Sequence, residues 1–151
     1  MNKVWTVFNT YALHDCMVNR VSFKEKQIVF FFPDGIYRLN AEGKADYLIP
    51  AGCVAITVKD TGEDSENIFV SEIVYRNPYH RKGRYQVKKE IHEVSKERFR
   101  KKVYQHGFCI NDVYYSAFSR TMLILGQCGA GEELSVEIAD VVDVLIHFNT
   151  P

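Results

Sequence analysis

Apolar and polar residues alternate along much of the chain, which is the pattern of strands that bury one face. The clearest run lies near the C-terminal end, where apolar side chains recur on even positions and only Asp140 interrupts them. This series predicts one half-buried strand, or two strands joined near Ala139-Asp140. Its members are Leu134, Val136, Ile138, Val142, Val144, Ile146 and Phe148.

Shorter segments of the same character fill most of the remaining chain. Residues 27–32 (QIVFFF) and 51–59 (AGCVAITVK) predict buried strands, and residues 68–76 and 84–94 predict the two long arms of a hairpin. Their connection, 77–83 (NPYHRKG), is rich in turn formers and in charge. Further strands are expected at 17–24, 36–39, 108–110, 113–116 and 121–127. The first of these should contain a bulge between Val18 and Val21, and an Asn111-Asp112 turn should separate 108–110 from 113–116.

One helix is predicted over residues 95–106. Ser95 suits the N-cap, because its hydroxyl accepts a backbone N–H that the first turn leaves unpaired. Phe99 and Val103 are four residues apart and share one face, and Gly107 suits the position that ends a helix. A longer helix beginning at Gln86 would put its own apolar side chains on the opposite face, so the pattern favours a break at Ser95.

Strands outnumber helices by a wide margin, and short turns join most of them. The sequence therefore predicts an α+β fold, mainly antiparallel β: a curved sheet or barrel-like meander with one helix at about 95–106. No internal repeat or low-complexity tract divides the chain, so residues 1–151 are expected to form a single β-rich domain. A chain of this length buries roughly 68–70% of its unfolded surface, so its stability requires neither disulfides nor a structural metal.

The longest uninterrupted apolar run, residues 28–32, is far shorter than the roughly 20 residues that cross a bilayer. The first residues lack the continuous apolar stretch of a signal peptide, so a cytoplasmic protein with no membrane partner is expected. The cysteines are scattered singly without metal-ligand spacing, which predicts reduced thiols, mostly in the core, and no metal or cofactor. They are Cys16, Cys53, Cys109 and Cys128.

Three groups capable of chemistry stand together at His14, Asp15 and Cys16. Adjacent residues at the entrance of a strand point to opposite faces, so His14 and Asp15 are not expected to form a base and its orienting carboxylate. Both are expected to bond to backbone groups instead. We therefore predict no catalytic residue and a protein that is not an enzyme.

The Leu13-His14-Asp15 opening is followed by an alternating strand, a short turn, an aromatic strand and an Asp34-Gly35 turn. Together with the ending His147-Phe148-Asn149, this arrangement resembles small uncharacterised bacterial β-rich families. Some of these families are grouped with immunity proteins of contact-dependent or polymorphic toxin systems. The resemblance implies a protein whose task is to bind another protein.

Charge is distributed unevenly along a chain whose formal net charge is zero. Residues 76–106 carry 11 basic and 3 acidic side chains, whereas residues 107–151 carry 1 basic and 6 acidic ones. Aromatic side chains are interleaved with the cations, a combination that dominates binding hot spots. The candidates for contact with a partner are Tyr79, Arg81, Lys82, Arg84, Tyr85, Arg98, Lys101 and Lys102.

Three interpretations of this basic stretch remain open. It can engage a protein partner that has an acidic face, or it can be a nucleic-acid-binding module that uses residues 79–102, with cations on phosphates and tyrosines on bases. It can also be a solvated face without a partner. Overall neutrality differs from the high pI typical of nucleic-acid modules, so a non-enzymatic protein-binding domain, immunity-like in role, is the expectation.

Overall fold

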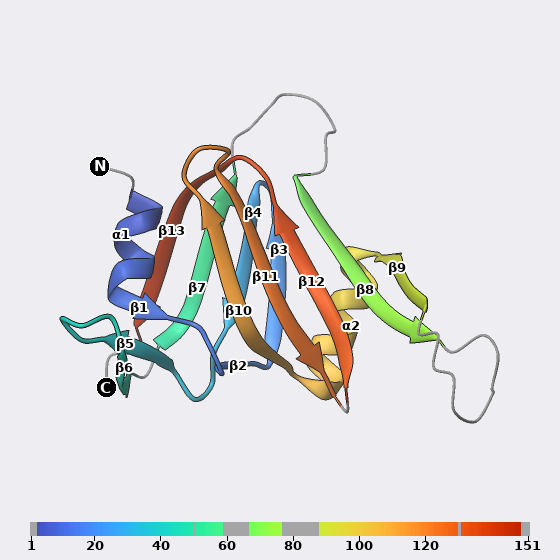
Figure 1. Ribbon diagram of the computed structural model, residues 1–151, viewed down its shortest axis with the longest axis horizontal. Coiled ribbons are helices and arrows are strands. Elements are labelled where there is room, and N and C mark those ends of the chain that lie inside the picture. The colour runs from blue at the N-terminus through green and yellow to red at the C-terminus, as the bar shows by residue number, and fades with distance from the viewer. Residues whose placement is uncertain (1–2, 50, 59–66, 77–87, 130, 149–151) are drawn as a thin grey trace.

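The computed structural model of the chain describes residues 3–49, 51–58, 67–76, 88–129 and 131–148 (Figure 1). Its strands pair antiparallel and form sheets of three, four and six strands. The predicted α+β fold, mainly antiparallel β, is therefore confirmed. Of the two shapes that the sequence allows, a closed barrel is not formed by any sheet within these residues.

The six-stranded sheet is built mostly from strands that follow one another in the chain. Two successive hairpins join residues 108–138, and a third hairpin adds the pair of long arms predicted from the sequence. Its spatial order is β2 (Met17–Val18), β10 (Phe108–Ser116), β11 (Thr121–Cys128), β12 (Glu132–Ile138), β8 (Ile68–Arg76) and β9 (Lys88–Val94).

The other two sheets come mainly from the first third of the chain and from its last strand. The four-stranded sheet has the order β13 (Val141–Phe148), β7 (Ala51–Val58), β4 (Gln27–Phe31) and β3 (Arg20–Lys24). The three-stranded sheet has the order β1 (Tyr11–Ala12), β5 (Ile36–Leu39) and β6 (Ala45–Ile49). β3 and β9 are thus edge strands of the two larger sheets.

A hydrophobic core joins the inner faces of the two larger sheets. Ile28, Phe30 and Ile56 of the four-stranded sheet belong to the same buried cluster as Ile124 and Val136 of the six-stranded sheet. The helix α2 (Lys96–His106) packs against β3 and β11, and its Phe99 and Val103 join this cluster. In Figure 1, α2 lies at the lower end of the two sheets.

A second helix, α1 (Lys3–Thr10), was not expected from the sequence. Its residues, KVWTVFNT, are mostly β-branched or aromatic and have modest helix propensity. Tertiary packing supplies the stability that propensity does not: Val4 is buried, Val7 and Phe8 pack on the core, and the helix contacts β13. Without acidic residues in its first turn or basic residues in its last turn, α1 lacks the charge pattern that marks a helix in a sequence.

The alternating C-terminal series forms two strands, β12 and β13, which belong to different sheets. The predicted bend lies at Ala139-Asp140, where Asp140 has a φ of 54°. The even-position rule fails twice: Val142 is 44% exposed while Val141 is 1% exposed, and Phe148 at the end of β13, after a second register shift, is 40% exposed. A bulge between Val141 and Asp143 inserts one extra residue and exchanges the two faces locally.

The predicted Asn111-Asp112 turn is wrong. β10 continues through these residues, and a bulge between Ile110 and Asp112 interrupts its pairing with β11. Turn-forming residues in a strand are compatible with a bulge, because one residue of the bulged strand leaves the ladder.

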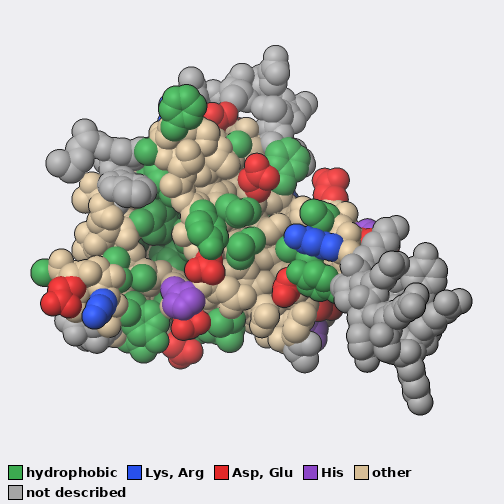
Figure 2. All heavy atoms as spheres, in the orientation of Figure 1, with side chains coloured by type: hydrophobic (Ala, Val, Ile, Leu, Met, Phe, Trp, Pro, Cys, Tyr) green, Lys and Arg blue, Asp and Glu red, His purple; other side chains and the backbone are tan. Residues whose placement is uncertain are grey.

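The outer face of the six-stranded sheet carries hydrophobic and acidic side chains side by side, as Figure 2 shows for the face turned toward the viewer. Phe69 and Tyr114 are 45% and 55% exposed, and Glu137 lies between them on β12. Among the described residues, no helix has the length and apolar character needed to span a membrane.

Candidate partner-binding groove

The helix that carries the central cations begins and ends as its sequence predicts. The Ser95 hydroxyl accepts the backbone N–H of Arg98 at 3.1 Å, and the Gly107 N–H donates to the Val103 carbonyl at 2.8 Å, with a φ of 75° at Gly107. Because Phe99 faces the core, the opposite side of α2 presents its charged side chains to solvent.

The three helical residues proposed from the sequence have different surroundings. Lys102 is drawn inward: its Nζ lies 2.5 Å from Oε2 of Glu132 on β12, and its side chain is only 13% exposed. The hydrogen bond from Lys102 lowers the pKa of the Glu132 carboxyl. The ion pair of Lys102 with Glu132 therefore links α2 to the six-stranded sheet, whereas Arg98 and Lys101 are exposed to solvent.

The other five candidates lie outside the described residues, so their positions relative to the helix are not part of the structure. They are Tyr79, Arg81, Lys82, Arg84 and Tyr85.

A groove runs between α2 and the edge strand β3. It encloses about 630 Å³, and its lining comes from one strand and the first turns of one helix. The lining residues are Arg20, Val21, Ser22, Phe23, Lys96, Glu97 and Arg100. A smaller hollow of about 290 Å³ shares Arg20 and Arg100 with the groove and extends it along the helix to Lys101, Tyr104 and Gln105.

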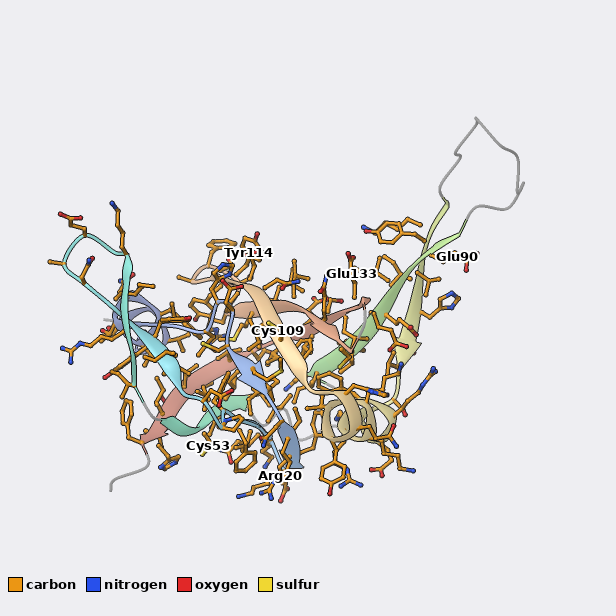
Figure 3. The ribbon with its side chains drawn as sticks, turned by 90° about the horizontal axis from the view of Figure 1, so that it is seen from below. Arg20, Cys53, Glu90, Cys109, Tyr114 and Glu133 are labelled. Atoms are coloured by element: carbon orange, nitrogen blue, oxygen red, sulfur yellow. The ribbon has the colours of Figure 1, made fainter. Side chains whose placement is uncertain are left out.

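Arg20 is a residue of this groove that lies outside the basic stretch and was not predicted from the sequence. It stands in β3, far from residues 76–106 in the chain, and only the packing of α2 on β3 brings it beside the helix, as Figure 3 shows. Its Cζ lies 4.1 Å from the centre of the Phe31 ring. An aromatic ring under a guanidinium both attracts it and restricts its orientation.

The remaining cations of the groove differ in how far they are neutralised. Arg100 donates two hydrogen bonds to Glu97, at 2.6 and 3.2 Å, and these lower the pKa of that carboxyl. Lys96 lies 5.9 Å from the centre of the Phe23 ring. Within the described part of the chain, Arg20, Lys96 and Lys101 make no ion pair. The groove therefore offers uncompensated positive charge to an anionic ligand.

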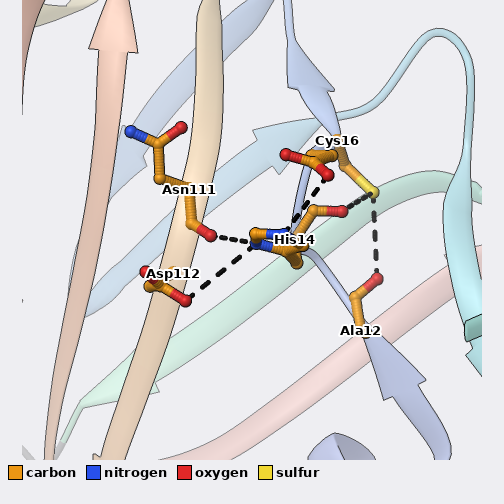
Figure 4. Close-up of polar contacts among 6 residues, drawn as sticks. Ala12, His14, Cys16, Asn111 and Asp112 are labelled. Carbon is orange, nitrogen blue, oxygen red and sulfur yellow. Dashed lines mark hydrogen bonds and ion pairs between the residues drawn. The ribbon is translucent and has the colours of Figure 1, made fainter. Parts of the chain in front are cut away.

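A second cluster surrounds His14, and here the expectation that His14 and Asp15 point apart is wrong (Figure 4). Asp15 has a φ of 61°, which turns its carboxylate back toward the imidazole, and Nε2 of His14 lies 3.2 Å from Oδ2 of Asp15. The expected contact with a backbone group is present for His14, whose Nδ1 contacts the Asn111 carbonyl. For Asp15 it is the main-chain N–H that donates, to the Ile110 carbonyl at 2.8 Å, while the carboxylate lies beside His14.

Among the residues that the structure describes, this cluster brings no activated nucleophile to the histidine. Cys16 is buried, and burial raises the pKa of its thiol to about 11, so the thiol stays protonated near neutrality. Its Sγ lies 3.8 and 3.6 Å from the carbonyl oxygens of Ala12 and His14. Asp112 approaches the imidazole only to 4.0 Å, and the described residues include no group of three or more side chains suited to a metal ion.

The chain matches no family model, no curated protein and no solved structure.

Proposed function

We propose that this chain is a protein-binding domain that holds an acidic, extended segment of its partner in the groove between β3 and α2. The observation that carries the proposal is a set of cations that make no ion pair with the described residues, arranged along the side of β3 that no described strand occupies. Arg20, Lys96 and Lys101 supply the charge, and β3 supplies the backbone.

The edge strand can accept a further strand. β3 and β4 form a hairpin with a two-residue turn, in which Lys24 lies opposite Gln27. In such a hairpin the pair next to the turn is joined by two backbone hydrogen bonds, and every second pair along the two strands is joined in the same way. By this alternation Arg20 and Ser22 also bond to β4, while the N–H and C=O groups of Val21 and Phe23 point away from it. An extended segment that pairs with these groups would gain main-chain hydrogen bonds, as in β-augmentation.

Charge would then select which segment binds. A carboxylate on the added segment would approach Arg20 and Lys96, which lie over aromatic rings and so lose less freedom on binding. Tyr104, 77% exposed at the end of the groove, offers the kind of side chain that dominates interface energetics. Positive charge beside an open edge strand favours an acidic segment over a basic one.

The toxin-immunity resemblance supports the same class of function, since an immunity-like protein acts by binding another protein. The nucleic-acid alternative shares the cations, but it requires bases to stack on aromatic side chains. Phe23 and Phe31 are engaged by their own cations, which leaves Tyr104 as the exposed ring of the described groove. We therefore place protein binding first.

The proposal is tested by selecting peptides from a random displayed library on the folded chain. The expected ligands are acidic peptides with strand-forming residues, and their binding weakens at high salt because exposed charges are screened. The triple reversal Arg20→Glu, Lys96→Glu, Lys101→Glu should weaken binding at least about tenfold, a loss of roughly 1.4 kcal/mol. Hydrogen exchange at the Val21 and Phe23 amides should slow in the complex.

The control variant reverses two exposed cations elsewhere, Lys44→Glu and Arg120→Glu, and should retain binding. Selected peptides without an acidic bias, or equal binding by the triple variant and the control, would contradict the proposal. Micromolar binding of a single-stranded oligonucleotide at physiological salt, lost in the triple variant, would establish the nucleic-acid alternative instead.

A further inference from the structure

β9 forms an edge of the six-stranded sheet on the side of the molecule away from β2 and β10. The β8–β9 arm stands out from the rest of the molecule in Figures 1 and 3, and Glu90 is labelled on it in Figure 3. Within the described residues, β9 pairs with β8 on one side and with no strand on the other. An open edge of this kind is a template for pairing with another chain unless something blocks it.

The residues of β9 are self-complementary about their centre. From Lys89 to Glu93 the sequence is Lys-Glu-Ile-His-Glu. If a second β9 runs antiparallel with Ile91 opposite Ile91, Lys89 lies opposite Glu93 at both ends, and Glu90 lies opposite His92 twice. Each directly opposed pair then consists either of two apolar side chains or of a glutamate opposite a lysine or a histidine. Such pairs stabilise adjacent strands.

We propose that β9 binds β9 of a second copy of this chain about a two-fold axis through Ile91, which joins the two six-stranded sheets into one. A two-fold axis perpendicular to the sheets keeps their outer faces on the same side and makes the contact self-complementary. This surface is separate from the groove between β3 and α2, so the inference is independent of the proposed function.

The exposed side chains near this edge fit such a contact. Ile91 is 66% exposed beside Ile73, and Tyr75, 54% exposed, lies on the same outer face opposite Lys89. Pairing would place a second Ile91 against the exposed flank of the first. Hydrophobic groups at the open edge of a sheet otherwise remain in contact with water.

The charged side chains also have places in the paired arrangement. Lys89 and Glu93 make no ion pair within the described part of the chain, and each would meet its opposite across the axis. On the other face of the strand, Nε2 of His92 already lies 3.0 Å from Oε2 of Glu90. In the dimer, Glu90 and His92 of both copies would meet at the axis, so that each glutamate lies beside a histidine.

Neighbouring registers are less favourable, which gives the contact a single alignment. Moving the axis to Glu90 sets two Glu90 carboxylates against each other, and like charges directly opposite destabilise a strand pair. Moving it to His92 sets Ile91 against Glu93. Charge complementarity therefore selects Ile91 as the centre.

Sedimentation velocity on the full chain over a range of concentrations tests the inference through charge reversal. The unmodified chain should dimerise, and Lys89→Glu or Glu93→Lys alone should weaken the dimer at least about tenfold, because each places like charges opposite each other twice. The double variant Lys89→Glu/Glu93→Lys should recover most of the affinity, since the charges are then exchanged but again complementary. Glu137→Lys, on the same face but away from the edge, should leave the dimer unchanged.

A cross-linking variant fixes the register. Ile91→Cys, mildly oxidised, should yield a disulfide between position 91 of one copy and position 91 of the other, identified by mass spectrometry, because directly opposed Cβ atoms lie about 4.5–5.5 Å apart. A monomer at every concentration, a dimer insensitive to both single reversals, or a double variant as weak as the single ones would overturn the inference. Circular dichroism of each variant confirms that these exposed substitutions leave the fold intact.

Discussion

Phe99 connects the basic helix to both larger sheets, so its truncation tests how the groove is held in place. The side chain is 0% exposed. Its ring centre lies 5.6 Å from that of Phe108 on β10, with an interplanar angle of 83°, and 6.4 Å from that of Phe23 on β3. A single residue of α2 thus contacts the six-stranded sheet and the strand that lines the groove.

The expected loss follows from these contacts. Replacing a fully buried Phe by Ala costs about 3–5 kcal/mol, including the cavity that remains. Aromatic pairs of this geometry contribute about 0.5–1.5 kcal/mol each beyond burial, and Phe99 has two, which favours the upper half of that range. For a domain with a total stability of roughly 5–15 kcal/mol, the loss is a large fraction. With a urea dependence of roughly 2 kcal/mol per molar, the midpoint should fall by about 2 M.

Urea unfolding followed by circular dichroism measures this shift, and Tyr104→Ala is the matched control. Tyr104 lies on the same helix but is 77% exposed, so its truncation should change stability by less than about 0.5 kcal/mol. If Phe99→Ala does not fold, Phe99→Leu keeps most of the volume and should cost about 1–1.5 kcal/mol. A loss below about 1 kcal/mol for Phe99→Ala, or equal losses for the two positions, would refute the role assigned to Phe99.

Three further changes test other parts of the structure. Gly126→Ala should destabilise the chain by about 1–3 kcal/mol in the same urea assay, because the added Cβ would lie 2.4 Å from a backbone carbonyl oxygen of β10; an unchanged midpoint would contradict this packing. Burial raises the pKa of Cys16 and Cys128 to about 11, so roughly one in a thousand is a thiolate at pH 8; mass spectrometry after native alkylation should show the two less buried cysteines modified first. Glu132→Gln should cost about 0.2–1 kcal/mol at pH 7. Because Lys102 lowers the pKa of the Glu132 carboxyl in the folded state, the stability that this carboxylate contributes is complete above the ordinary pKa of 4.5 and is lost as the pH falls through the lowered pKa. The melting temperatures of the unmodified chain and of Glu132→Gln should therefore converge at acid pH.

Elements with a local signal could be predicted closely from the sequence. The helix α2 begins after Ser95 because that hydroxyl caps the first turn, and it ends where Gly107 takes a positive φ. Both signals are contained in a few neighbouring residues. By contrast, α1 owes its stability to contacts of Val4 and Phe8 with distant strands, and no short-range rule detects such contacts.

Side-chain direction was less predictable than secondary structure. The even-position series holds from Leu134 to Ile138, but the bulge after Val141 places Val142 on the exposed face. Asp15 turns back toward His14 because its φ is positive, although alternation predicts that the two side chains point apart. One inserted residue or one positive φ is enough to turn a neighbouring side chain to the opposite face.

The sequence by itself determined the class of fold, the basic helix and the separation of positive from negative charge, because periodicity, capping and composition are properties of consecutive residues. Only the tertiary structure decided what that charge can do. It removed Lys102 from the exposed surface by pairing it with Glu132, and it brought Arg20 from β3 to the side of α2. It also left the self-complementary strand β9 at the edge of a sheet. Which cations remain uncompensated and which strands remain unpaired depends on contacts between distant segments, and those contacts exist only after the two sheets have closed over a common core.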